Sequence, residues 1–218
     1  MINENILTSE GDNQLFQEFV KNEQLSELQA GQFKVYLRLL IEWNEKFNIT
    51  ALTSTSEIIS FHFQDSLALD KCINLEEISM IADVGTGGGF PGIPLKIKYP
   101  HLAIQLIEVN QKKVQFLTMI AQKLGLTNMQ TSDLDWRTFL RKTNYPIDLF
   151  VSRASLAPEE LIRLFKGDSP YQKARMVYWA SMHWHPSAKE APLIEKEHSY
   201  KIDHKSRRLI FFKKTDVR

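Results

Sequence analysis

The sequence has little of several features that mark specialised classes of protein. Its single cysteine, Cys72, excludes an internal disulfide and a cysteine-based zinc cage. No apolar run approaches the roughly 20 residues that a membrane-spanning helix needs. The first residues lack the basic region and the apolar segment of a secretory signal. We therefore expect a cytoplasmic protein without a membrane partner.

An excess of one sign of charge is also lacking. The 218 residues include 27 Lys and Arg against 26 Asp and Glu, which excludes a uniformly basic nucleic-acid coat. The charges are unevenly distributed, however. Residues 1–30 contain one lysine and six acids, whereas residues 196–214 contain seven Lys and Arg and two acids. The basic segment allows a local patch that faces phosphate.

No repeat, low-complexity stretch or linker rich in Gly, Ser or Pro divides the chain, so we expect one compact unit with two parts. Residues 1–76 show helical spacing of apolar residues, as in Phe33, Leu37 and Leu40, and no strand pattern. They predict a cap of about three helices. Residues 77–218 alternate strand and helix patterns, which predicts an α/β fold with a parallel sheet and right-handed crossovers.

The elements expected after residue 77 are defined by short apolar runs and by helical spacing. The strands are expected at residues 79–84, 101–109, 147–152, 175–180 and 208–213. Helices are expected at residues 91–98 and 111–124, the second ending at Gly125, and another is expected to begin at Pro158.

Glycine is concentrated in one place. Five of the nine glycines lie in the string Asp83-Val84-Gly85-Thr86-Gly87-Gly88-Gly89-Phe90-Pro91-Gly92, which follows an expected strand and opens an expected helix. The missing side chains let the backbone turn sharply and approach a ligand closely. The following helix presents free backbone N–H groups and the positive end of its dipole. This pattern predicts a ligand-binding loop, although a structural turn without a ligand stays an alternative.

Two acids distinguish the ligands that such a loop binds. Asp83 precedes the glycines, where a carboxylate suits an ammonium group or an ordered water. Glu108, 23 positions after Gly85, ends the next expected strand and can accept hydrogen bonds from both hydroxyls of a ribose. No Gly-Lys-Ser/Thr follows, so a triphosphate loop is unsupported. An ammonium, a ribose and no phosphate describe S-adenosylmethionine better than NAD, which stays open because a ribose-binding acid serves both.

Several blocks of the sequence, in the same order, resemble the bacterial guanine-N7 methyltransferases of small-subunit ribosomal RNA, also called glucose-inhibited division protein B. The matching blocks are Trp43 to Thr50, His62 with Asp65-Ser66, Asp83 to Pro94, Lys112 to Leu117, Ser152-Arg153-Ala154 and Arg207-Arg208-Leu209. The resemblance implies a helical cap on a Rossmann-like methyltransferase domain, S-adenosylmethionine as the methyl donor with S-adenosylhomocysteine as product, and 16S ribosomal RNA or the small subunit as the partner. We expect a monomer that does not act on DNA.

The resemblance also implies roles for individual residues. Gly85 and Phe90 would line the methionine and ribose side of the donor pocket, with Gly85 at the closest approach of the backbone, and Glu108 would hold the ribose. Asp135, Trp136 and Arg137 align with the adenine side. The full expected cofactor-binding set is Asp83, Gly85, Gly87, Gly89, Phe90, Glu108, Asp135, Trp136, Arg137 and Arg153. A core position for either aromatic, or a surface ion pair of Arg153, is the alternative.

The implied reaction needs no general base, because guanine N7 carries an exposed lone pair and no proton leaves it. Catalysis then reduces to in-line placement, which is worth about 7 to 11 kcal/mol. Arg153 and Arg207 are the catalytic candidates, since each would face the carboxyl edge of the sheet or the RNA. Arg208, Lys112 and Lys113 are candidates for phosphate contacts, although a solvated helix face is the preferred interpretation of the two lysines. His62 and Asp65, at i and i+3 on one helix, are expected to make a structural contact near the cap and not a catalytic pair.

Two positions depart from the family's pattern. Asp135 stands where the family has arginine, and Ala180 stands where it has the lysine of a Leu-Lys-Gly strand end. Arg137 is a candidate substitute for the first. These changes leave open two alternatives: a non-catalytic relative that binds the donor or RNA, and a methyltransferase for another substrate. His183-x-His185 lacks acids or cysteines at ligand spacing, so we expect no metal.

Overall fold

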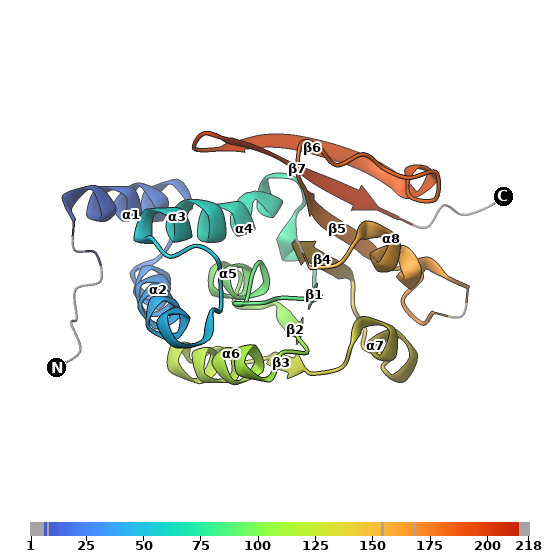
Figure 1. Ribbon diagram of the computed structural model, residues 1–218, viewed down its shortest axis with the longest axis horizontal. Helices are drawn as coiled ribbons and strands as arrows, with labels where there is room; N and C mark the ends of the chain where they lie inside the picture. Colours follow the sequence, from blue (N-terminus) through green and yellow to red (C-terminus); the bar gives the residue numbers. More distant parts are fainter. Residues whose placement is uncertain (1–6, 8, 154, 168, 214–218) are drawn as a thin grey trace.

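The computed structural model describes residues 7, 9–153, 155–167 and 169–213. Ala154, the last residue of one matching block, lies outside the described residues. Seven strands and several helices make up the described chain (Figure 1). In that part of the protein, no helix has both the length and the apolar character to cross a membrane.

The chain begins with helices, as predicted for its first 76 residues. They are α1 (Glu10–Asn22), α2 (Glu27–Phe47), α3 (Thr55–Ile58), a π-helical segment η1 (Ile59–Gln64), α4 (Asp65–Leu67) and the 3-10 turns η2 (Ala68–Lys71) and η3 (Leu75–Glu77). Serine side chains begin the first three helices by accepting backbone N–H groups, and Ser26 forms a full capping box with Gln29. Whether these helices form a separate cap from residues 77–218 stays a prediction.

The remaining elements alternate as expected. They are β1 (Met80–Val84), α5 (Gly92–Lys98), β2 (Ala103–Ile107), α6 (Gln111–Leu124), β3 (Met129–Ser132), α7 (Trp136–Lys142), β4 (Leu149–Arg153), α8 (Pro158–Leu161), the 3-10 turn η4 (Ile162–Phe165), β5 (Arg175–Ala180), the 3-10 turn η5 (Ala191–Leu193), β6 (Ile194–Ile202) and β7 (Lys205–Phe212). Asn110 caps α6, and Gly125 ends it in the left-handed conformation, so the predicted bounds of this helix are confirmed.

The sheet has the order β3-β2-β1-β4-β5-β7-β6. The prediction of a parallel sheet is confirmed for β1 to β5, but β7 pairs antiparallel with β5, and β6 pairs antiparallel with β7. The strands β3 and β6 and the helix α7 were not predicted. Both strands lie at the edges of the sheet, where burial on one side only leaves a weak apolar signal.

Alternate residues of each strand enter two separate cores. Ile81 and Val177 pack with the N-terminal helices, α5 and α6, whereas Ala82 and Met176 pack with α7 and α8. Figure 1 shows α2 and α6 on the opposite side of the sheet from α7 and α8. This layering brings the segments that follow β1, β2, β4 and β5 to one edge of the sheet, the edge at which ligands of open α/β folds bind.

Candidate functional site

A cavity of about 830 Å³ lies at this edge. Its volume falls near the upper end of the range for ligand pockets, roughly 300 to 1,000 Å³. Of the predicted site residues, the structure brings the following to its wall: Gly85, Gly87, Phe90, Glu108, Asp135, Trp136, Arg153 and Arg207. Asp83, Gly89 and Arg137 do not line it.

The glycine loop follows β1 and leads into α5. Gly85, Gly87 and Gly89 have φ angles of +67°, +61° and +102°, in the region that residues with a Cβ rarely adopt. The loop is held by the neighbouring strand, because the carbonyl of Ile107 accepts hydrogen bonds from the N–H groups of Gly85 and Thr86. The sharp turn predicted from the glycines is therefore present.

The three glycines are required for different reasons. A Cβ on Gly85 would lie 2.1 Å from the Cβ of Ser155, and one on Gly89 would lie 2.4 Å from Ile93. A Cβ on Gly87 would meet nothing closer than the Nζ of Lys113, at 4.0 Å. At Gly85 the glycine is needed because Ser155 packs against its Cα, and the expectation that its backbone approaches the ligand most closely stays a prediction. Gly87 is the position where the open backbone faces the cavity.

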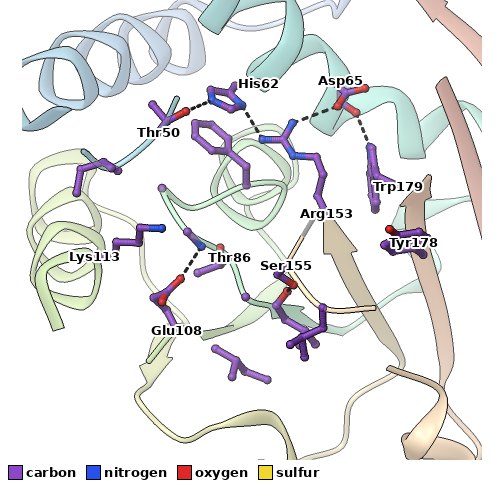
Figure 2. Close-up of a pocket in the computed structure, with 18 of the residues that line it drawn as sticks. Thr50, His62, Asp65, Thr86, Glu108, Lys113, Arg153, Ser155, Tyr178 and Trp179 are labelled. Atoms are coloured by element: carbon purple, nitrogen blue, oxygen red, sulfur yellow. Dashed lines mark hydrogen bonds and ion pairs between the residues drawn. The ribbon is translucent and has the colours of Figure 1, made fainter. Parts of the chain in front are cut away.

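Glu108 lies beside this open backbone. Its Oε2 accepts a hydrogen bond from the N–H of Gly87 at 3.0 Å, and its Oε1 accepts one from the N–H of Asn110 at 2.9 Å (Figure 2). The residue is buried, with 8% of its surface exposed. Each carboxylate oxygen retains a lone pair that can accept a further hydrogen bond.

Asp83 is fully buried beneath the loop. Its Oδ2 accepts hydrogen bonds from Thr86 Oγ1 at 2.6 Å and from the N–H of Gly92 at 2.8 Å, while its Oδ1 has no partner among the described residues. Burial raises the pKa of Asp83 to about 6, against the lowering effect of these two hydrogen bonds. The side chain of Asp83 therefore stabilises the conformation of the glycine loop through these two hydrogen bonds.

Arg153 connects β4 with the π-helical segment. Its Nη1 donates to the carbonyl of Phe61 at 2.9 Å and to Asp65 Oδ2 at 3.2 Å, and its Nη2 lies 2.6 Å from His62 Nδ1 (Figure 2). His62 and Asp65, for which a structural contact was expected, both bind Arg153. Its side chain is 12% exposed, so it is no ordinary surface ion pair.

The contacts of His62 fix its protonation state. A guanidinium only donates, so Nδ1 must accept from Arg153, and Nε2 carries the proton that it shares with Thr50 Oγ1 at 2.7 Å. Burial and the charge of Arg153 hold the pKa of His62 well below its usual range. The ring also stacks on Phe90, with 4.1 Å between centroids. His62 is therefore neutral, and its two ring nitrogens form hydrogen bonds with Arg153 and Thr50.

Asp65 binds more than one cation. Its Oδ1 accepts from Tyr200 Oη at 2.7 Å and lies 4.0 Å from Arg207 Nε. Its backbone carbonyl accepts from Trp179 Nε1 at 2.9 Å. Through its carboxylate and its backbone carbonyl, Asp65 thus links the ends of β4 and β5 and the β6–β7 hairpin to the N-terminal helices.

The adenine-side segment Asp135-Trp136-Arg137 separates into three environments. Asp135 caps α7, because its side chain accepts from the N–H and the Oγ1 of Thr138. Trp136 begins α7 instead of lying in a loop; it is 5% exposed and donates its Nε1–H to the carbonyl of Glu160. Arg137 points outward and forms a two-pronged ion pair with Glu160. The acid that replaces the family's arginine therefore has a local structural role.

The remaining predicted cations also lie in different places. Arg208 is turned away from the cavity and binds Glu197 and the carbonyls of Ser181 and Trp184. Lys112 lies over the ring of Phe47, whereas Lys113 lines the cavity. Sequence reasoning missed Lys205, which also lines the cavity, with its Nζ 3.9 Å from the centroid of Phe61. No group of three or more His, Cys, Asp or Glu suited to a metal occurs among the described residues.

The amino-acid sequence matches a known protein family. A family model described as rRNA small subunit methyltransferase G matches residues 29–176. The chain belongs to this family. Proteins named ribosomal RNA small subunit methyltransferase G are similar to it: that of Bacillus pumilus is 43% identical over 102 residues, covering 47% of this chain and 43% of the relative. That of Bacillus cereus is 40% identical over 132 residues, covering 60% and 55%. The chain spans about half the length of the curated relatives it matches.

Solved structures show the fold alone. An S-adenosylmethionine-dependent methyltransferase of Aquifex aeolicus has a TM-score of 0.53 at 17% identity, covering 76% of this chain and 97% of that one. M. capricolum TrmK, solved with S-adenosylhomocysteine, has a TM-score of 0.52 at 22% identity, covering 68% and 67%. The Rossmann-like methyltransferase fold that the resemblance implied is confirmed.

Proposed function

We propose that this chain transfers a methyl group from S-adenosylmethionine to N7 of a guanine in 16S ribosomal RNA. The observation that carries the proposal is the open backbone of Gly87 beside the carboxylate of Glu108, at the carboxyl edge of the sheet. Membership of the family and the fold shared with methyltransferases support it.

The residues present fit the donor. The space beyond Gly87, which a Cβ would enter, admits a ligand against the backbone, and Glu108 has acceptor capacity left for the hydroxyls of a ribose. Gly85, Phe90, Asp135 and Trp136 complete that side of the wall. When bound, the donor supplies a methyl group already activated by its sulfonium. The protein's part is to bind, orient and exclude water.

The proposed acceptor chemistry does not need a free base at the cavity wall. Methylation of N7 releases no proton, so a general base has no task. His62, the only histidine that lines the cavity within the described part of the chain, has both nitrogens engaged. Arg153 and Arg207 are held by Asp65 at the wall and are the proposed groups that orient the guanine. The protein's contribution to catalysis is to orient the guanine toward the methyl group of the donor.

The RNA must offer the guanine outside a regular helix. In A-form RNA, N7 lies in a deep and narrow groove that side chains do not enter. The cavity lies between the glycine loop, η1 and the ends of β4 and β5. We propose an unpaired or flipped guanine as the substrate.

The test has two steps. Isothermal titration with S-adenosylmethionine and S-adenosylhomocysteine measures donor binding, and transfer of a tritiated methyl group to small subunits that lack the mark measures the reaction. Cleavage of the RNA chain at 7-methylguanine then locates the product. We expect donor binding and one labelled guanine. Donor binding without transfer would support a non-catalytic relative, and label at another atom or molecule would support a different substrate.

A further inference from the structure

Four cationic side chains line the cavity, but they differ in how their charge is used. Arg153 is paired with Asp65, and Arg207 lies within 4.0 Å of the same carboxylate. Lys113 and Lys205 form no ion pair with any carboxylate in the described part of the chain. The lysines therefore retain unneutralised charge at the wall.

The acids of the wall form no ion pair with the two lysines. Asp65 binds Arg153 and Tyr200, whereas Glu108 accepts from two backbone N–H groups and Asp135 accepts from the first turn of α7. Free cations that share a cavity wall attract an anion that crosses the opening. In an RNA methyltransferase, the anion next to the target base is the phosphate backbone.

The two lysines lie on different walls. Lys113 extends from α6 over the glycine loop, as Figure 2 shows, and its Nζ is 4.0 Å from the position of a Cβ on Gly87. Lys205 begins β7 and lies over the face of Phe61, in the π-helical segment. Both lysines are half-buried.

We propose that Lys113 and Lys205 are the phosphate contacts of a single-stranded RNA that crosses the mouth of the cavity from α6 to the β6–β7 hairpin, with the target guanine entering between them. Lys205 thereby supplies a cation to the cavity that Ala180 also lines, where Ala180 replaces the family's lysine. The inference rests on the proposed function in that it takes RNA as the substrate.

The test is the salt dependence of RNA binding, measured by fluorescence anisotropy with a single-stranded RNA oligonucleotide of mixed sequence. Each phosphate contact to a single strand contributes about 0.7 to the slope of log K against log salt. We expect Lys113→Gln and Lys205→Gln each to reduce the slope by about 0.7, and the double variant by about 1.4. Donor affinity, measured by titration calorimetry, should not change in Lys205→Gln, because Lys205 lies over Phe61 and not beside Gly87.

The chain offers matched controls. Lys112 is the neighbour of Lys113 on α6 but lies over Phe47, outside the cavity. Lys196 lies on the same hairpin as Lys205, 4.7 Å from the centroid of Phe211, and also outside the cavity. Lys112→Gln and Lys196→Gln should leave the slope unchanged.

The proposal would be overturned by an unchanged salt-dependence slope in either test variant, or by an equal reduction of the slope in the controls. A loss of donor affinity in Lys113→Gln without a change of slope would also overturn it. Because the oligonucleotide assay needs no methyl transfer, these results are distinguishable from failure of the proposed function. If the protein methylates subunits but the slopes are unchanged, the proposed function stands and the proposed lysine contacts are excluded.

Discussion

The carboxylate of Glu108 accepts a hydrogen bond from the backbone N–H of Gly87, with 3.0 Å between Oε2 and N. The contact joins the end of β2 to the loop that follows β1, and it places an acceptor beside the one glycine of the loop whose missing side chain leaves the cavity open. Both ends of the proposed donor site, backbone and carboxylate, are thus fixed before a ligand binds.

Replacing Glu108 by Gln should weaken donor binding by roughly ten- to a hundredfold, because hydrogen bonds to a charged group are worth about 1.5 to 3 kcal/mol. The amide leaves one acceptor oxygen for the N–H of Gly87 and a ribose hydroxyl together. Titration calorimetry with S-adenosylhomocysteine measures the change. Glu27→Gln, at the exposed start of α2, is the control. Unchanged affinity in Glu108→Gln would exclude Glu108 as the ribose ligand.

Arg153→Lys should abolish most methyl transfer while the fold persists, because lysine keeps the charge beside Asp65 but lacks the fork that reaches Phe61 and His62. Arg153→Ala should also destabilise the fold, by about 3 to 5 kcal/mol, since it leaves Asp65 buried without this partner. Single-turnover transfer and urea denaturation separate the two effects. Full activity of the lysine variant would show that Arg153 has only a structural role.

The free energy of unfolding should decrease as the pH rises from 4 to 6 and above, because Asp83 loses its proton in the folded protein. The pKa of Asp83 is about 6 in the folded protein, against 3.8 for the group in water, so the folded state binds the proton more tightly. The stability that the protonated form contributes is complete below pH 4 and is lost as the pH rises through 6, by about 3 kcal/mol in all.

Urea denaturation of the protein and of Asp83→Asn between pH 4 and 8 measures this contribution. The free energy of unfolding of the variant, minus that of the unaltered protein, should increase with pH across this range. A difference that does not change with pH would contradict the raised pKa.

Local signals gave most of the fold. The bounds of α6 and β5 were predicted from apolar spacing, because each ends at a clear stop or lies in the centre of the sheet. The edge strands β3 and β6 alternate little in burial and were missed. The glycine loop and Glu108 were found because their chemistry depends on short spacings along the chain.

Long-range contacts explain what the sequence did not reveal about the site. His62 and Arg153 are 91 positions apart, and only the fold shows that they meet. Asp135 was interpreted as a lost cation, and only the structure shows that its carboxylate caps the first turn of α7. Lys205 carried no motif, and its place at the cavity follows from the pairing of β7 with β5.

The measurement that tests the central claim most directly is the affinity of Gly87→Val for S-adenosylmethionine. The valine side chain would project into the cavity, and the φ angle of +61° is unfavourable for a β-branched residue. We predict that donor binding is lost while thermal unfolding of the N-terminal helices stays cooperative, and that Gly31→Ala, at an open position of α2, binds normally. A folded Gly87→Val variant that binds the donor with unchanged affinity would contradict the account.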